Sequence, residues 1–288
     1  MTIRKILVPV TGTDTGLASL GAAFELGRHL DAHVEGLHAQ RNARDALAYI
    51  GEGMTGAMIE ELITTAEQES TALAQRARSD FAAACERAGF AQTEARSDGE
   101  RCTAHLRLET GREEDFIALA GRVADLIVVA RAGKDDDVLL RATLEAALLE
   151  SGRPLLVVPP DGIRGPLATI AIGWNGSAEA ARAVTSALPL LARAEHVAVV
   201  WVEEGVRPGP SADDLVDYLA WHDVPVTTHD TKAEYGSTGE ALLAQAAEIG
   251  AGLMIIGAYT HTRLRRMIYG SATEHMLNAA GIPILMVH

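Results

Sequence analysis

With 288 residues, 48% of them hydrophobic and 22% charged, the chain has the composition of a folded protein and the length of about two ordinary domains. Its formal net charge of −14 argues against a nucleic-acid partner, because such partners are bound by clustered Lys and Arg. The apolar runs are far shorter than the roughly 20 residues of a membrane span, and the N-terminus lacks a signal-peptide core, so we expect a cytoplasmic protein with no membrane segment.

The chain begins with a buried-strand pattern that ends in a small polar turn, and an alanine- and leucine-rich helix follows. A second strand starts with His-Val, and the segment "MIEELITTAEQESTALAQRARSDFAAACERAG" then predicts a long amphipathic helix. A capped helix leads into an apolar strand, and one more helix precedes a closing strand. These elements fall at residues 6–13, 16–30, 33–39, 58–89, 111–131 and 152–160.

The same pattern recurs in the second half of the chain, with "IAIGWNGS" in place of "ILVPVTGT" and "GIPILMVH" in place of "GRPLLVVPP". A short segment, "SADDLVDYLAWH", stands where the first half has its long helix. The chain is therefore an internal repeat, and the long helix is expected either to cover the sheet or to face a partner. The recurring blocks lie at residues 170–177, 178–194, 196–202, 237–258 and 281–288.

The alternation of strands and helices predicts the fold class. Strands that alternate with helices of about 12 residues indicate parallel βαβ units, and short all-apolar strands indicate a sheet covered by helices on both faces. Each half is therefore expected to be a doubly wound α/β domain with a five-stranded parallel sheet. We expect the first domain at residues 1–160 and the second at 166–288, joined by "DGIRGP" at 161–166.

The candidate ligand site lies at the ends of the strands, because open α/β sheets bind ligands where the strand order reverses. In the second half this position is "GAYTHTRLRRMIYGS", in which Gly257 ends a strand and Gly270 with Ser271 opens the last helix. Main-chain N–H groups at a helix start favour an anion, and the three arginines of the stretch could hold phosphates. The alternative is ordinary N-capping beside a basic surface turn.

The equivalent loop of the first half has a different character. Ala130 stands at the position of Gly257, Arg141 stands at the position of Gly270, and three aspartates at 135–137 add negative charge. A bulky side chain and these carboxylates would repel a phosphate. If either half binds a nucleotide, we expect it to be the second.

These residues resemble the universal stress protein family in its tandem form. The resemblance covers nearly the whole chain and rests on the opening strand of each half, the strand order and the glycine loop before the closing strand. It implies a flavodoxin-like fold of the adenine nucleotide alpha-hydrolase type. In nucleotide-binding members the loop holds the ATP phosphates, and an Asp after strand 1 contacts the nucleoside. Here Thr260 replaces the middle glycine of the loop, and Thr11 and Asn175 replace the Asp.

Carried onto the second half, the resemblance implies a pocket for an adenine nucleotide, with ATP, alone or with Mg²⁺, as the expected cofactor. Asn175 could accept a ribose hydroxyl proton or donate to adenine. Trp174 could stack on the base or pack beneath the loop. The implied nucleotide-binding residues are Gly173, Trp174, Asn175, Val202, Ile256, Gly257, Thr260, Arg263, Gly270, Ser271, Ala272 and Thr273.

Enzymatic motifs are absent from the sequence: it contains no Walker A motif, dinucleotide fingerprint, GxSxG elbow or HExxH. No motif places a metal ligand, or a carboxylate that could act as general base near the phosphates, so any hydrolysis should be slow. Our first hypothesis is a stress-response regulatory protein that senses an adenine nucleotide. The alternative is a nucleotide-independent adaptor that acts through an unidentified protein partner.

The resemblance also implies how the two halves assemble, because single-domain members pair through their last strands. "PLLVVP" at 154–159 would then lie beside "PILMVH" at 283–288. Each is a short apolar edge strand that would invite aggregation if it were exposed. We therefore expect a pseudo-dimeric chain, in which a further homodimer is allowed but not required.

Overall fold

The computed structural model describes residues 2–42, 55–94, 102–131, 138–165, 167–202, 209–231, 237–258 and 272–288. The elements of the first half are β1 (Lys5–Pro9), α1 (Asp14–Leu30), β2 (His33–Gln40), α2 (Gly56–Ala88), β3 (Ala91–Gln92), β4 (Thr103–Thr110), α3 (Glu113–Gly121), β5 (Leu126–Ala130), α4 (Val138–Glu150) and β6 (Leu155–Val158). Those of the second half are β7 (Thr169–Trp174), α5 (Ala178–Leu191), β8 (His196–Val202), α6 (Ala212–Ala220), β9 (Val226–Thr231), α7 (Thr238–Glu248), β10 (Leu253–Gly257), α9 (Ala272–Ala279) and β11 (Ile284–Val287).

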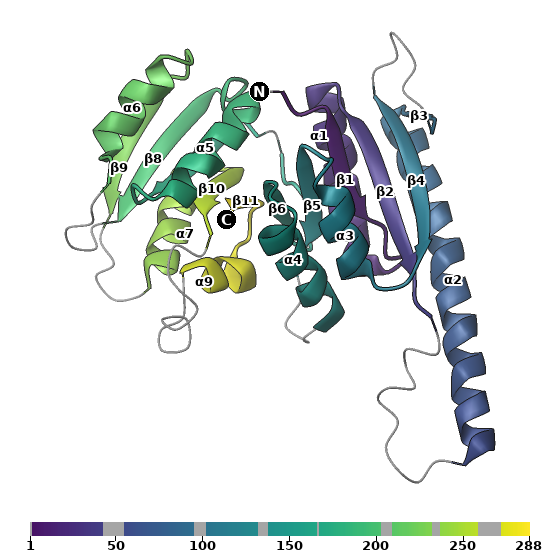
Figure 1. Ribbon diagram of the computed structural model, residues 1–288. Helices are drawn as coiled ribbons and strands as arrows, with labels where there is room; N and C mark the ends of the chain where they lie inside the picture. Colours follow the sequence, from purple (N-terminus) through teal and green to yellow (C-terminus); the bar gives the residue numbers. More distant parts are fainter. Residues whose placement is uncertain are drawn as a thin grey trace.

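The strands of the described residues form one 11-stranded sheet that runs through both halves (Figure 1). Its order is β3-β4-β2-β1-β5-β6-β11-β10-β7-β8-β9. The strands of each half are parallel, and the chain order reverses between β1 and β5 and again between β7 and β10. The predicted doubly wound halves are confirmed. The first half differs from the five-stranded expectation by β3, which adds two residues beside β4.

The two halves meet at β6 and β11, which pair in antiparallel fashion. Leu156 lies opposite Leu285 at the centre of this seam, and their exposed fractions are 1% and 0%. The expected pairing of the two closing strands is therefore confirmed. Each strand covers an apolar edge that would otherwise be open to pairing with another chain.

Helices cover both faces of the sheet (Figure 1). Side chains alternate between the faces along β1, so that Ile6 and Val8 enter one apolar cluster and Leu7 enters the other. The first cluster takes side chains from α1, α2, α5 and α6, and the second takes them from α3, α4, α7 and α9. Both clusters contain residues of both halves, so the core is continuous across the seam. None of the described helices is long and apolar enough to cross a membrane.

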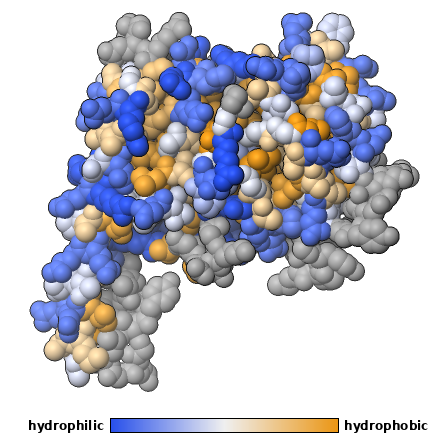
Figure 2. All heavy atoms as spheres, turned by 180° about the vertical axis from the view of Figure 1, so that it is seen from behind, coloured by the Kyte–Doolittle hydropathy of each residue, from blue (hydrophilic) through white to orange (hydrophobic). Residues whose placement is uncertain are grey.

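The long helix expected in the first half is α2, which extends beyond the body at the lower right of Figure 1. The Thr55 side chain accepts the N–H of Met58 at its start, and Gly89 ends it in the left-handed region with φ of 73°. Phe81 is buried where the helix crosses the sheet. At the free end Met58 and Leu62 are 49% and 46% exposed, and apolar residues gather there in Figure 2.

Candidate functional site

The predicted site residues of the second half come from the carboxyl ends of neighbouring strands. Gly173 and Ile256 lie opposite each other where β7 pairs with β10, and Val202 ends β8 on the other side of β7. Ala272 and Thr273 open α9. The strand-end residues of the prediction therefore lie together at the point where the strand order reverses. Four predicted residues lie outside the described residues, namely Thr260, Arg263, Gly270 and Ser271.

The side chains around Gly173 belong to the packed interior. A Cβ atom on Gly173 would lie 3.0 Å from Cγ2 of Ile256 and 3.3 Å from Cδ1 of Leu242, which comes from α7. Ile256 and Val202 are also buried, at 5% and 9% exposed. Any contact of Gly173 or Ile256 with a ligand would therefore come from the main chain.

Trp174 lies in the apolar cluster shared with α5 and α6, and its exposed fraction is 5%. Its indole N–H donates to the carbonyl oxygens of Pro210 and Ser211, both at 3.0 Å. Of the two roles considered for Trp174, the structure supports packing beneath the loop rather than stacking on a base. The indole N–H gains its partner there, as a buried tryptophan requires.

The segment before α6 was not predicted to contribute to the site. It lies against the turn after β7, where Gly176 has φ of 69° and a Cβ atom on Gly209 would lie 2.6 Å from the Gly176 carbonyl oxygen. Two glycines are needed for this close approach of main chain to main chain. The Gly-Pro pair at 209–210 is the sequence signal that could have indicated it.

Asn175 occupies the turn after β7. Its Oδ1 accepts the N–H of Ser177 at 3.1 Å, and the Ser177 Oγ accepts the N–H of Ala180 at 3.1 Å, which caps α5. The Asn175 amide nitrogen has no hydrogen-bond partner among the described residues. Asn175 is therefore better placed to donate to a ligand than to accept from one.

Gly257 is fixed by packing. A Cβ atom at this position would lie 2.4 Å from the Ala180 nitrogen and 2.8 Å from Cβ of Glu179, so only glycine lets the first turn of α5 approach the end of β10. The Glu179 carboxylate, which would repel a phosphate, accepts from Arg182 at 2.9 Å. This ion pair lessens the negative charge beside the strand end.

The start of α9 lies beside the start of α7. A Cβ atom on Gly239 would lie 3.0 Å from the Ala272 carbonyl oxygen and 2.9 Å from Cβ of His275. Thr273 is 5% exposed and is directed into the protein, whereas Ala272 is partly exposed. Of these two predicted residues, Ala272 is the one at the surface.

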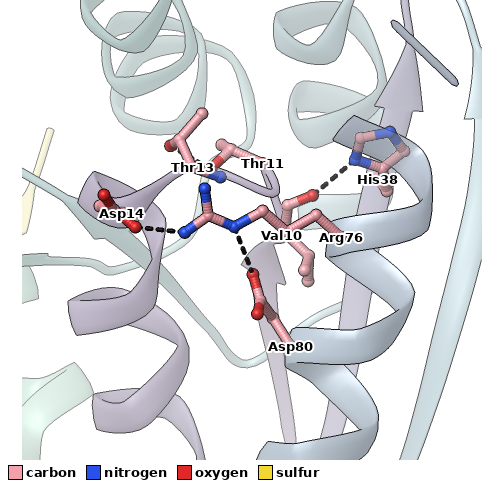
Figure 3. Close-up of polar contacts among 7 residues, drawn as sticks. All are labelled: Val10, Thr11, Thr13, Asp14, His38, Arg76 and Asp80. Carbon is pink, nitrogen blue, oxygen red and sulfur yellow. Dashed lines mark hydrogen bonds and ion pairs between the residues drawn. The ribbon is translucent and has the colours of Figure 1, made fainter. Parts of the chain in front are cut away.

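The corresponding edge of the first half is covered by α2 (Figure 3). Gly12 has φ of 71°, and a Cβ atom on it would lie 2.3 Å from the carbonyl oxygen of Leu73. Arg76 of α2 forms an ion pair with Asp14 at the start of α1, and its Nε lies 3.8 Å from Oδ2 of Asp80 on its own helix. The long helix therefore occupies the space over the turn after β1.

His38 is buried under the same helix, at 4% exposed. Its Nδ1 lies 2.6 Å from the carbonyl oxygen of Val10, which can only accept, so Nδ1 carries the proton (Figure 3). Its Nε2 is buried and has no hydrogen-bond partner among the described residues. Burial lowers the pKa of His38 below its ordinary value of 6.5, with a smaller lowering by the positive charge of Arg78 and an opposing rise from the Val10 bond.

A pH dependence of stability follows from this shift. As the pH falls below 6.5, the unfolded chain takes up a proton on His38 before the native chain does, so the free energy of unfolding decreases until the lower native pKa is passed. Urea denaturation at several pH values should show a flatter profile over this window for His38→Gln. A partial slope should remain, because burial also lowers the pKa of His33. Equal slopes for the variant and the parent would contradict the assignment.

A link between the halves was also missed by sequence reasoning. Arg131 follows β5, and its Nη1 donates to the carbonyl oxygen of Asn278 in the last turn of α9 at 3.0 Å. A positive charge at a helix carboxyl terminus is favourable. The two residues are 147 positions apart, so no local pattern could have indicated the contact.

The amino edge of the second half contains a groove of about 470 Å³, which Thr169 and Pro283 help to line. Its charged lining residue, Arg164, is ion-paired with Asp161. The groove lies away from the strand ends where the predicted residues gather. Within the described ranges, no group of three or more His, Cys, Asp and Glu side chains is arranged to hold a metal ion.

The arrangement described above agrees with a comparison of the sequence with known families. A sequence model of the Universal stress protein family matches residues 2–159 and, a second time, residues 167–288. The chain belongs to the universal stress protein family. The double match makes it a tandem universal stress protein, as the resemblance of the sequence implied.

Among solved structures, two that cover nearly the whole chain share its fold. A universal stress protein from Archaeoglobus fulgidus is 17% identical, with 99% of this chain and 96% of that chain covered and a TM-score of 0.68. A putative universal stress protein from Pseudomonas aeruginosa is 16% identical, with coverage of 99% and 93% and a TM-score of 0.50. A universal stress protein in complex with cAMP is 19% identical, with coverage of 55% and 98% and a TM-score of 0.34. A search of curated proteins found no match.

Proposed function

We propose that this universal stress protein binds an adenine nucleotide, ATP, at the carboxyl edge of its second half and acts as a stress-response regulator rather than as an enzyme. The contrast between the two halves carries the proposal. In the first half α2 lies over the turn after β1, with the Leu73 carbonyl against Gly12. In the second half the equivalent turn is met by the short segment before α6, and Asn175 retains an unpartnered amide nitrogen among the described residues.

The residues of the second half suit the parts of a nucleotide. The Asn175 amide can donate to the ribose or to the base. The main chain at the start of α9 faces the edge at which open sheets bind ligands, and a helix start favours a phosphate. Four more residues would complete the phosphate site from their places in the sequence, namely Thr260, Arg263, Gly270 and Ser271. The guanidinium groups of Arg263, Arg265 and Arg266 would neutralise the negative charge of ATP.

Gly270→Arg tests the site, because it gives position 270 the arginine that the first half has at the equivalent position, Arg141. We expect ATP binding to weaken by more than about tenfold, since a bulky side chain would stand where main chain meets phosphate. The matched control is Gly281→Arg, because Gly281 is exposed and a Cβ atom there would meet nothing within 4 Å. Calorimetric titration with ATP, with and without Mg²⁺, measures both variants.

The parent protein provides the second readout. ATP at about 100 times its Kd should raise the free energy of unfolding by about 2.7 kcal/mol and so raise the melting temperature. Equal binding by the Gly270 and Gly281 variants would exclude the loop as the phosphate site. If the purified protein released no nucleotide on denaturation and showed no thermal shift with excess ATP, the nucleotide hypothesis would fail.

A nucleotide-independent adaptor is the second candidate function. The observation that favours it is α2, because the helix covers the edge of the first half and extends beyond the body with Met58 and Leu62 exposed at its free end. The melting temperature of a nucleotide-independent adaptor would not change on addition of ATP. The titration of the parent protein therefore separates the two functions.

A further inference from the structure

Helix α6 forms the outer side of the second half, beside the edge strand β9 (Figure 1). Leu215 and Leu219 are its buried residues, and they face β8 and β9. Positions 213, 217 and 221 follow one another at intervals of four residues on the opposite side, and position 218 lies next to them. These positions hold Asp213, Asp217, Trp221 and Tyr218. The outward face of α6 is therefore acidic and aromatic.

Trp221 is the most exposed large apolar residue of the described part of the chain, at 88%. Tyr218, one turn before it, is 38% exposed and contacts the ring of His222 edge to face, with centroids 4.8 Å apart. A single exposed apolar residue would need no explanation. Here the chain has three tryptophans, and the other two are buried or partly buried, so an aromatic pair is left in water on one helix face.

Two of the three carboxylates of α6, those of Asp213 and Asp217, are available to a partner. Asp214 accepts from the main-chain N–H and the hydroxyl of Ser211, which completes a capping box. Asp213 and Asp217 are exposed and form no ion pair within the part of the chain that the structure describes. Asp217 lies one turn before Trp221, on the same side of the helix. The negative face of an indole and a neighbouring carboxylate attract the same kind of group, a cation.

We propose that the outward face of α6, made of Asp213, Asp217, Tyr218 and Trp221, is a docking surface for a Lys- and Arg-rich segment of another protein. A guanidinium or ammonium group would lie over the Trp221 ring while neighbouring basic side chains pair with Asp213 and Asp217. The net charge of −14 attracts such a segment from a distance and repels nucleic acid. The surface shares no residue with the candidate nucleotide site, so the inference stands apart from the proposed function.

The test uses the full chain and a fluorescein-labelled poly-arginine peptide as probe, followed by fluorescence anisotropy. We expect the parent to bind the peptide with an affinity that falls as salt rises. Trp221→Ala and Trp221→Leu should both weaken binding about fivefold, because leucine keeps an apolar side chain but lacks the aromatic face. Asp213→Asn with Asp217→Asn should weaken it to a similar degree.

The matched control is Glu67→Gln with Glu69→Gln on α2, which removes two exposed carboxylates from a helix without an exposed aromatic residue. This variant should bind the peptide within about twofold of the parent. Unchanged binding by the Trp221 variants, or an equal loss in the α2 control, would overturn the proposal. Sedimentation velocity without peptide adds a third outcome. If the parent self-associates and Trp221→Ala abolishes this, the occupant is a second copy of the chain and the basic partner is excluded.

Discussion

Replacing Phe81 by alanine is expected to lower the free energy of unfolding by about 3–5 kcal/mol. The Phe81 side chain is 1% exposed and packs between α2 and the sheet. Its ring meets that of Phe24 edge to face with centroids 5.5 Å apart, and it fills the space over Gly36, where a Cβ atom would lie 2.5 Å from the ring. Removing the ring would leave a cavity between α1, α2 and β2, which the main chain cannot close. Urea denaturation followed by circular dichroism measures the loss.

The matched control for this prediction lies on the same helix. Leu62→Ala removes an apolar side chain that is 46% exposed, so its effect should stay within about 0.5 kcal/mol. The Phe81 variant should also expose α2 to limited proteolysis at lower protease concentrations than the control requires. Similar stabilities for the two variants would mean that α2 is not held to the sheet through Phe81.

The second large effect is expected at the seam between the halves. Leu285→Ala and Leu156→Ala should each lower the free energy of unfolding by about 2–5 kcal/mol, because both side chains are fully buried and face each other across β6 and β11. Since the two side chains are neighbours, the double variant should depart from the sum of the single effects by about 0.5–3 kcal/mol. Chemical denaturation of the parent, the two single variants and the double variant measures this coupling energy as a double-mutant cycle.

Leu119→Ala serves as the control for the seam, because Leu119 is 57% exposed on α3. Its combination with Leu285→Ala should be additive within about 0.5 kcal/mol. An additive result for Leu156 and Leu285 as well would show that the two strands do not share a packed interface.

The duplicated architecture could be predicted from sequence because its signals are local. Short strands without polar residues, such as 6–10 and 170–174, indicate a sheet that is buried on both faces. The closing strands are also apolar, which indicates that their edges are paired rather than exposed. The length of α2 was equally evident from its periodicity. The two-residue strand β3 was not, since a pair of exposed residues carries no pattern.

Much of the candidate site depends on contacts between distant parts of the chain, which no local pattern specifies. The resemblance assigns Gly257 to phosphate, and the structure adds a packing contact with Glu179 and Ala180 that no local pattern indicated. The Trp174 side chain is fixed by carbonyl groups 36 and 37 positions away. The ion pair of Arg76 with Asp14 spans 62 positions. The last two depend on how the segment after the second strand of a half crosses the turn after the first.

The antiparallel seam has a geometric consequence. All strands of one half run parallel to its closing strand, and the two closing strands run in opposite directions, so the carboxyl edges of the halves open at opposite poles of the molecule. One pole is closed by α2. The scaffold is therefore symmetric, but among the described residues the turn after the first strand is covered by a long helix in the first half alone. With the proposed ATP site confined to the second half, titration with ATP should follow a simple hyperbola with one ligand per polypeptide.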